Sequence, residues 1–109
     1  MINIEQYKPS SEVTKEFLRE NNFRYMDGYY SYRFPVHKYK KEPTLWCFIY
    51  INLERNSCNF NVTDSNFNTY PAFFNQNGQK NKVVETVERK INEQLNTFIK
   101  DKILKKRED

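Results

Sequence analysis

The stretch YYSYRFPVHKYKK, residues 29–41, decides how this chain folds. Its even positions from residue 30 are apolar, and its odd positions from residue 31 are mostly polar, cationic or amphipathic. The first set is Tyr30, Tyr32, Phe34 and Val36, and the second is Ser31, Arg33, Pro35, His37, Tyr39 and Lys41. A two-residue period is typical of a β-strand with one buried face. We therefore expect a strand over about 29–38 whose second face meets something other than the main core.

Two further strands are expected after this one, over 44–54 and 57–64. In 44–54, residues Leu45, Cys47, Ile49, Ile51 and Leu53 alternate with Trp46, Phe48, Tyr50 and Asn52; in 57–64, residues Cys58, Phe60 and Val62 alternate with Ser57, Asn59, Asn61 and Thr63. Residues 70–74 are expected to add a short strand, which Pro71 would keep at the edge of the sheet. The pattern predicts an antiparallel meander of three or four strands.

The hairpin turns predict a register for these strands. Turns at Arg55-Asn56 and near Lys41-Glu42 would pair apolar residues with apolar residues on one inner face, as a buried sheet face requires. The expected pairs are Leu53 with Cys58, Ile51 with Phe60 and Ile49 with Val62, and Val36 with Cys47, Phe34 with Ile49 and Tyr32 with Ile51. On the outer face, the same register places Arg33 opposite Tyr50, Pro35 opposite Phe48 and His37 opposite Trp46, with Asn61 and Thr63 beside them.

Helices are expected on both sides of the meander. Pro9-Ser10-Ser11-Glu12 has the hydroxyls and the acid of a helix start, and Asn21-Asn22 would end that helix. Asp27-Gly28 is a strong signal for a type I′ hairpin turn. After a loop at 76–79, a long helix is predicted over about 81–105, with an apolar stripe at three- and four-residue steps: Val84, Val87, Ile91, Leu95 and Phe98.

The expected fold is therefore one α+β domain over 1–109: an N-terminal helix, the antiparallel meander, and a long C-terminal helix packed on one sheet face. Residues 1–8 and 106–109 are expected to fray. The chain has 109 residues, 17% of them aromatic, so the core would depend on Phe and Tyr.

Composition sets limits on location and partners. The formal net charge of +4 permits an acidic partner, but Lys and Asn are also inflated in proteins from AT-rich genomes. The start of the chain lacks a cationic head followed by an apolar segment, and the apolar run at 45–51 is too short to span a membrane. We expect a cytoplasmic protein without membrane contact, whose two cysteines stay reduced.

The aromatic row Trp46, Phe48 and Tyr50 is unusual for a sheet face that would otherwise meet solvent. It could be a second small core under the first helix. It could be an interface with another protein or a second copy, because Trp, Tyr, Phe and Arg are enriched at interfaces. It could also be a platform on which nucleic-acid bases stack. In the last two cases the cationic border would be Arg33, His37, Lys38, Lys40 and Lys41.

The element order is also similar to that of double-stranded-RNA-binding domains, in which lysines at the start of the last helix contact phosphates. Lys80 and Lys82 stand at about that place in this sequence. The double-lysine motif and the alanine-rich last helix of those domains are absent, so the similarity is limited to element order.

Catalytic patterns are weak. His37 is the single histidine, so no histidine-based metal cluster can form. The strand parity places Cys47 on the inner face and His37 on the outer face, which separates the one conceivable Cys–His pair. We expect no enzyme activity, no small-molecule cofactor and no metal.

Three segments resemble a pattern in small uncharacterised proteins of phages and mobile elements of AT-rich bacteria. They are residues 30–36, 44–47 and 61–66, with weaker support from 81–84. The resemblance implies accessory work, such as handling nucleic acid or binding a host protein, and it carries over no catalytic residue. The sequence thus predicts a non-catalytic binding protein with a protein partner or homodimer, or alternatively nucleic acid, at a surface made of Arg33, His37, Lys38, Lys40, Lys41, Trp46, Phe48 and Tyr50.

Overall fold

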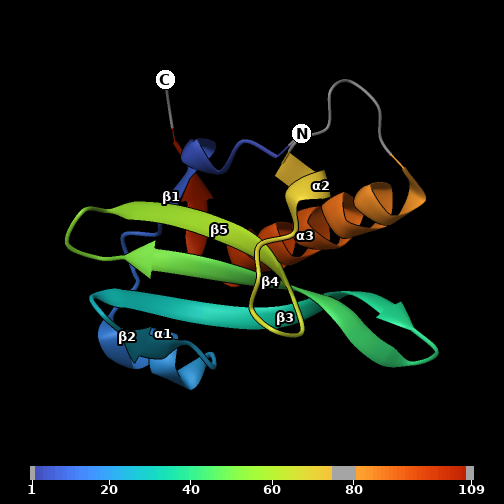
Figure 1. The fold of residues 1–109 in the computed structure, drawn as a ribbon. Coiled ribbons are helices and arrows are strands. Elements are labelled where there is room, and N and C mark those ends of the chain that lie inside the picture. The colour runs from blue at the N-terminus through green and yellow to red at the C-terminus, as the bar shows by residue number, and fades with distance from the viewer. Residues whose placement is uncertain (1, 75–80, 108–109) are drawn as a thin grey trace.

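The computed structural model describes residues 2–74 and 81–107 as an α+β fold with two antiparallel sheets (Figure 1). A four-stranded sheet has the order β2-β3-β4-β5, and a two-stranded sheet joins β1 to β6. The elements in chain order are η1 (Ile4–Gln6), β1 (Tyr7–Pro9), α1 (Lys15–Glu20), β2 (Arg24–Met26), β3 (Tyr29–Tyr39), β4 (Glu42–Asn52), β5 (Ser57–Asp64), α2 (Pro71–Phe74), α3 (Lys82–Lys100) and β6 (Leu104–Lys106).

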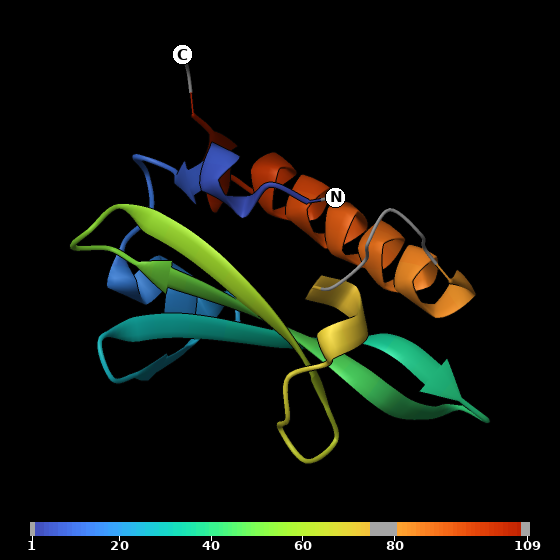
Figure 2. The same ribbon diagram turned by 45° about the horizontal axis from the view of Figure 1, so that its top comes forward.

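The long helix α3 covers one face of the four-stranded sheet, which we call the inner face (Figure 2). Cys47, Ile49 and Ile51 of β4 are fully buried there, whereas the residues that alternate with them are only half-buried. The helix contributes the apolar stripe that its spacing predicts: Val84, Val87, Ile91, Leu95 and Phe98. The strand parity is therefore confirmed, and Trp46, Phe48 and Tyr50 lie on the opposite, outer face.

The predicted register between β3 and β4 is wrong by two residues. Phe34 pairs with Cys47 and Tyr32 with Ile49, because the turn is at Lys40-Lys41 rather than at Lys41-Glu42. Both turn residues have positive φ (50° and 70°), as a type I′ turn requires. The strands also carry irregularities between Pro35 and Lys38, which absorb an extra residue at Val36 without turning it out of the core.

The second hairpin shows a similar correction. Ile51 pairs with Cys58 and Ile49 with Phe60, since the connection has four residues (53–56) instead of two. The Asn52 side chain accepts a hydrogen bond from the Arg55 amide (3.0 Å) and so favours the longer turn. A shift of two residues preserves the parity of a strand, so the side chains of β4 and β5 keep their expected faces.

The fourth strand is β2 rather than the expected strand at 70–74. The Asp27-Gly28 turn is confirmed: both residues have positive φ, and Met26 pairs with Tyr29. Residues 71–74 instead form the short helix α2, whose Phe73 is buried against Phe60.

The first helix begins later than the sequence predicts. Its N-cap is Thr14, whose hydroxyl accepts the Phe17 amide (3.1 Å), and it ends at Asn21 as expected. The hydroxyl-rich start at Ser10 makes only a local turn, because the preceding residues 7–9 are held in a strand.

The two ends of the described chain pair with each other instead of fraying. Tyr7 lies opposite Lys106 and Pro9 opposite Leu104. Helix α3 begins after Asn81, whose side chain caps the Val84 amide, but it stops at Lys100 rather than at 105. Lys102 with φ 63° redirects the chain, so that Ile103 and Leu104 enter the core. The expected loop at 76–79, and Lys80, lie outside the described residues.

Candidate binding surface

The outer face of the four-stranded sheet has three half-buried aromatic residues along its central strand. Trp46, Phe48 and Tyr50 lie between neighbours of β3 and β5 that are mostly small or polar. In the observed register the neighbours are Pro35 and Thr63 for Trp46, Arg33 and Asn61 for Phe48, and Ser31 and Asn59 for Tyr50. The expectation that Arg33 faces Tyr50 is therefore wrong by two residues. His37 lies opposite Leu45 instead of Trp46, a displacement of one residue at the irregular part of the hairpin.

Four rings form a continuous row across this face, which we call the ring row: Phe67, Phe48, Tyr50 and Tyr29. Consecutive ring centroids are 6.1, 6.0 and 6.2 Å apart. Phe67, with 67% of its surface exposed, and Tyr29, with 41%, end the row at opposite sides. Aromatic surface of this extent on a sheet face is typical of an interaction site.

Arg33 stands opposite Phe48 of the ring row, but its guanidinium extends toward Trp46. Its guanidinium carbon is 4.3 Å from the centroid of the Trp46 ring, so the pair makes a cation–π contact diagonally across β3 and β4. The guanidinium shields one side of the indole, and it adds planar donors at the edge of the apolar surface.

His37 does not border the ring row. Its Nδ1 atom is 2.8 Å from the Thr44 hydroxyl, which in turn donates to the His37 carbonyl (3.3 Å). This pair closes the irregular part of the β3–β4 hairpin, so its geometry gives the imidazole a local structural role.

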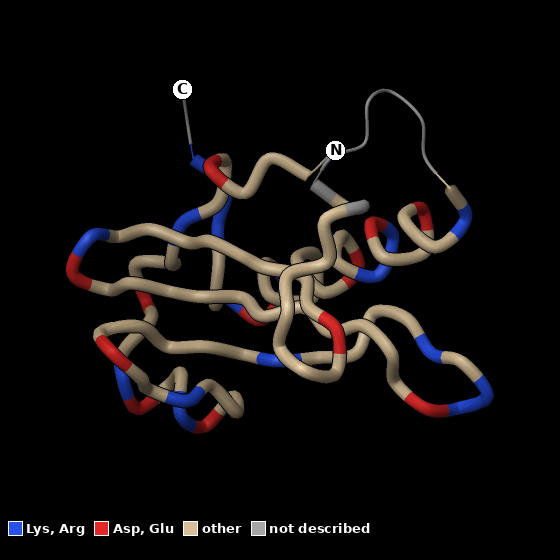
Figure 3. The backbone as a smooth tube through the Cα atoms, in the orientation of Figure 1, with Lys and Arg blue, Asp and Glu red and all other residues tan. Residues whose placement is uncertain are grey.

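The lysines predicted for the border are at the far end of the hairpin. Lys38, Lys40 and Lys41 are exposed around the β3–β4 turn, which we call the basic tip, and the Lys40 ammonium is 5.5 Å from the Tyr39 ring centroid. Figure 3 shows this tip projecting from one end of the sheet. The cations therefore flank one end of the aromatic surface instead of surrounding it.

Phe67 is presented by a loop that the Asp64 side chain organises. One carboxylate oxygen accepts the amides of Asn66 (2.8 Å) and Asn68 (3.0 Å), and these bonds hold the pKa of Asp64 below its ordinary value. The Asp64 amide in turn donates to the Asn68 carbonyl (2.9 Å). Within this turn, Phe67 has φ 65°, a conformation that a bulky side chain rarely adopts.

A shallow recess lies at the other end of the ring row. It is lined by Tyr29, Tyr50 and Asn59, and has a volume of about 230 Å³. Burial raises the pKa of the Tyr50 hydroxyl, which therefore stays a neutral hydrogen-bonding group at pH 7.

The first helix does not cover this surface. Its Leu18 belongs to the inner core, and Phe23, just beyond it, packs against Tyr32 and Phe98. Within residues 2–74 and 81–107, every helix belongs to the α3 side of the sheet or to its edge (Figures 1 and 2). The interpretation of the row as a second core under that helix is thus wrong, although Phe67 of the 64–70 loop packs against Phe48.

Sequence reasoning missed three residues of the surface: Tyr29, Asn59 and Phe67. Strand alternation could have found the first two. Tyr29 is an even number of residues from Arg33 on β3, and Asn59 is two residues from Asn61 on β5, so each lies on the same face as that residue. Phe67 gives no such signal, because it lies in a turn whose shape depends on the Asp64 hydrogen bonds.

The thiols and the histidine offer little chemistry. Cys47 and Cys58 are buried and not in a disulfide, and burial raises the pKa of both thiols, to about 12 for Cys58. A thiol protonated at pH 7 is a poor nucleophile. In the described part of the chain, no three His, Cys, Asp or Glu side chains are grouped so that they could hold a metal ion.

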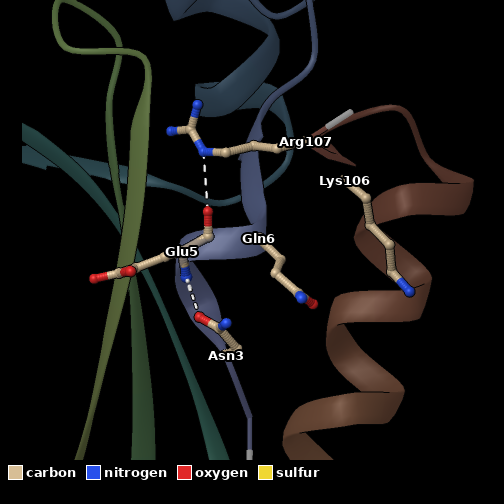
Figure 4. Close-up of a pocket in the computed structure, with 5 residues that line it drawn as sticks. All are labelled: Asn3, Glu5, Gln6, Lys106 and Arg107. Carbon is tan, nitrogen blue, oxygen red and sulfur yellow. Dashed lines mark hydrogen bonds between the residues drawn. The ribbon is translucent and has the colours of Figure 1, made fainter. Parts of the chain in front are cut away.

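A polar pocket near the chain ends is built around Arg107 (Figure 4). Its guanidinium donates to the carbonyls of Glu5 (2.9 Å) and Asn56 (3.0 Å), and its amide donates to Gln6. Lys106 is directed away from Arg107. These bonds tie the C-terminal strand to η1 and to the β4–β5 turn, so the pocket is a structural junction.

Comparisons with known proteins give a relationship of fold. No family model and no curated protein matches this chain. A solved DUF1831-family protein from Lactobacillus plantarum has a similar structure, with a TM-score of 0.64 and 15% sequence identity over 97% of this chain and 94% of that chain. At this identity, the similarity supports the α+β fold and carries no information about activity. None of the helices formed by residues 2–74 and 81–107 is long and apolar enough to cross a membrane.

Proposed function

We propose that this chain is a non-catalytic binding protein that contacts a protein partner through the outer face of its sheet. The observation that carries the proposal is the ring row, which leaves Phe67 with 67% of its surface in solvent. Burying such rings against a partner removes apolar area from water at roughly 25 cal/mol per Å². Aromatic residues are also the ones that most often dominate binding energy at interfaces.

The conformation of Phe67 supports the same proposal. A non-glycine residue at positive φ costs on the order of 1–3 kcal/mol, and such strain concentrates at binding and active sites. The Asp64 hydrogen bonds impose this conformation, and the result is an exposed phenyl ring above the sheet. A loop selected for stability alone would place glycine or asparagine here.

The distribution of charge favours a protein over nucleic acid. Among the described residues of β3–β5 whose side chains border the ring row, Arg33 is the permanent cation, and it is engaged with Trp46. Figure 3 shows the other Lys and Arg residues spread over the molecule with Asp and Glu between them. Non-specific nucleic-acid binding instead needs several cations along one path.

The origin of the protein is part of this proposal. The likeness of residues 30–36, 44–47 and 61–66 to small phage and mobile-element proteins supports an accessory role toward a host protein or a second copy of the chain.

The experiment is affinity capture with three immobilised forms of the protein: wild type, Phe67→Ser and Tyr25→Ser. Tyr25 is the matched control, because it is an aromatic residue with 56% exposure on the α3 side of the sheet, against Tyr30. We expect wild type and Tyr25→Ser to retain the same bacterial protein, identified by mass spectrometry, and Phe67→Ser to lose it. Equal recovery of bacterial proteins on all three forms would contradict any protein partner other than a second copy of this chain.

Nucleic acid is the second candidate, because the basic tip adjoins the Trp46 end of the surface. The apparent affinity for a fluorescent oligonucleotide should then fall steeply between about 50 and 200 mM salt, as counterions are released. Replacing Lys38, Lys40 and Lys41 by Gln should reduce that slope. A flat salt dependence excludes this candidate.

A further inference from the structure

The outer face has a projection and a hollow on opposite sides of Phe48. The loop that carries Phe67 leaves the sheet after Asp64, which pairs with Leu45 on the Trp46 side of Phe48. The recess lined by Tyr29, Tyr50 and Asn59 lies on the other side. Along β4 and β5, the projection and the hollow are therefore displaced in opposite directions from the Phe48–Asn61 pair.

We propose that the outer face joins two copies of this chain about a two-fold axis, with Phe67 of each copy seated in the Tyr29–Tyr50–Asn59 recess of the other. The two-fold axis would pass near Phe48, in the plane between the two sheets and perpendicular to the strands. Rotation about it reverses the strand direction, so the Phe67 side of one copy faces the recess side of the other. Each projection then lies above a recess of the second copy, as a self-complementary interface requires. Two sheets packed in this way about 10 Å apart form a β-sandwich.

Charge at the ends of the sheet favours this axis over a two-fold axis that runs parallel to the strands. An axis parallel to the strands would place the basic tip of one copy on that of the other, with Lys38, Lys40 and Lys41 facing the same three lysines. The perpendicular axis instead brings each tip over the opposite end of the second sheet, where Asp27 and Glu54 are exposed. Lys15 and Arg55 line the same region, so the electrostatic gain is chiefly the removal of the lysine repulsion.

The spacing along the strands agrees with this arrangement. Arg33 pairs with Phe48 at the proposed axis. On β3, the chain runs from Arg33 to Lys40 in about as many residues as it runs on β4 from Phe48 to Glu54. Because β3 and β4 are antiparallel, these two segments lead away from the axis in opposite directions. The basic tip and the Glu54 turn are consequently at similar distances from the axis, on opposite sides of it.

The recess also has hydrogen-bonding groups that are suited to a second copy. Tyr50 and Asn59 bring a hydroxyl and an amide to the recess, and such groups both donate and accept hydrogen bonds. A face with both kinds of group and few charges can complement itself. This inference rests on the proposed protein-binding function and names the partner as a second copy of this chain.

The first test is the mass in solution, measured by sedimentation equilibrium over a wide range of protein concentration. Wild type is expected to reach twice 13.3 kDa. Phe67→Ser should weaken the dimer about tenfold or more, as expected for an aromatic side chain seated in a partner's recess, whereas Tyr25→Ser should leave it unchanged. Wild type that stays a monomer at millimolar concentration, or a dimer insensitive to Phe67→Ser, would overturn the proposal.

The second test is a charge exchange between the two ends of the sheet. Lys40→Glu/Lys41→Glu should weaken its own dimer, because the altered tip meets Asp27 and Glu54. Glu54→Lys should also weaken its own dimer, because the tip then meets an added lysine. An equimolar mixture should restore dimers at low salt, since in the heterodimer each end meets the opposite charge. Dimers that do not recover in the mixture would overturn the two-fold arrangement.

The outcomes separate this inference from the proposed function. A monomer that captures another protein through Phe67, with Tyr25→Ser behaving as wild type, would overturn the homodimer and leave the proposed function intact. Capture of other proteins that is equal for all three forms, together with a dimer that requires Phe67, would support the homodimer as the whole function of the face.

Discussion

At the scale of single residues, Asp64 and Phe67 show how a strained side chain is held on the surface. The Asp64 carboxylate bonds two backbone amides, and these bonds to an ionised acceptor are stronger than neutral ones. They keep Phe67 at positive φ with its ring against Phe48. The position of the ring therefore depends on a residue three positions earlier in the chain.

Replacing Asp64 by Ala is expected to release this loop. Nuclear Overhauser contacts between the Phe67 and Phe48 rings should disappear, whereas Ser65→Ala should keep them. The same loss should occur on acidification. The pKa of Asp64 is lowered in the folded state, so its stabilising contribution is present above the ordinary pKa and is lost as pH falls through the folded value. Contacts that persist in Asp64→Ala would show that the carboxylate does not position Phe67.

The two cysteines provide a second prediction at this scale. Burial raises the pKa of the Cys58 thiol to about 12, and it also raises that of Cys47. A disulfide reagent at pH 8 should therefore leave both thiols unmodified in the native protein and modify both after denaturation. Because their pKa is raised on folding, stability should also fall as pH rises above the ordinary thiol value of about 9. Rapid native labelling would contradict this burial.

At the scale of elements, turn geometry sets the register and alternation sets the face. The alternation in β4 correctly predicts which side chains face α3, because a strand exposes every second residue to the same side. The register could not be obtained in the same way. The positive φ of Lys40 and Lys41, and the bond from the Arg55 amide to Asn52, are properties of folded turns that no composition rule anticipates.

For the outer surface, too, alternation predicts which strand residues share the face, but it does not predict what the turns contribute. Trp46, Phe48, Tyr50 and Arg33 follow from parity, but Phe67 does not, since its place depends on the Asp64 turn. The early end of α3 was also not predictable. Residues 101–105 continue a helical pattern of charge, but burial of Ile103 and Leu104 against β1 outweighs their helical preference.

The β2–β3 turn offers a test at this scale. Gly28 has φ +88°, and a Cβ atom placed on it would meet nothing within 4 Å. Gly28→Ala should therefore lower the free energy of unfolding only through backbone strain, by about 1 kcal/mol in urea denaturation. Gly28→Asn should cost less, because asparagine tolerates this conformation. A loss of several kcal/mol on Gly28→Ala would indicate a contact that the structure lacks.

At the scale of the whole molecule, the pairing of β1 with β6 fastens the two ends of the described chain beside the sheet. Leu104 is almost fully buried, and Arg107 bonds both Glu5 and Asn56. The fold similarity to the DUF1831-family protein spans 97% of this chain, so it is not restricted to the central meander.

Leu104→Ala should accordingly destabilise the protein by about 2–5 kcal/mol, the range for truncating a buried leucine. Lys105→Ala, on an exposed residue of the same strand, should change stability by less than about 0.5 kcal/mol. Hydrogen exchange provides the structural check: the Arg107 amide, which donates to Gln6, should be protected in wild type and exchange faster in Leu104→Ala. An unprotected Arg107 amide in wild type would contradict the pairing.

The β1–β6 pairing also has a consequence for how the protein is made. Residues 7–9 leave the ribosome long before residues 104–106, at roughly 5–20 residues per second of translation. The nascent meander can form its hairpins from local contacts during that time, but Tyr7 and Pro9 have no partner strand until residues 104–106 have been made. We therefore expect the meander, with its outer rings, to form in a newly made chain before β1 is fastened to β6.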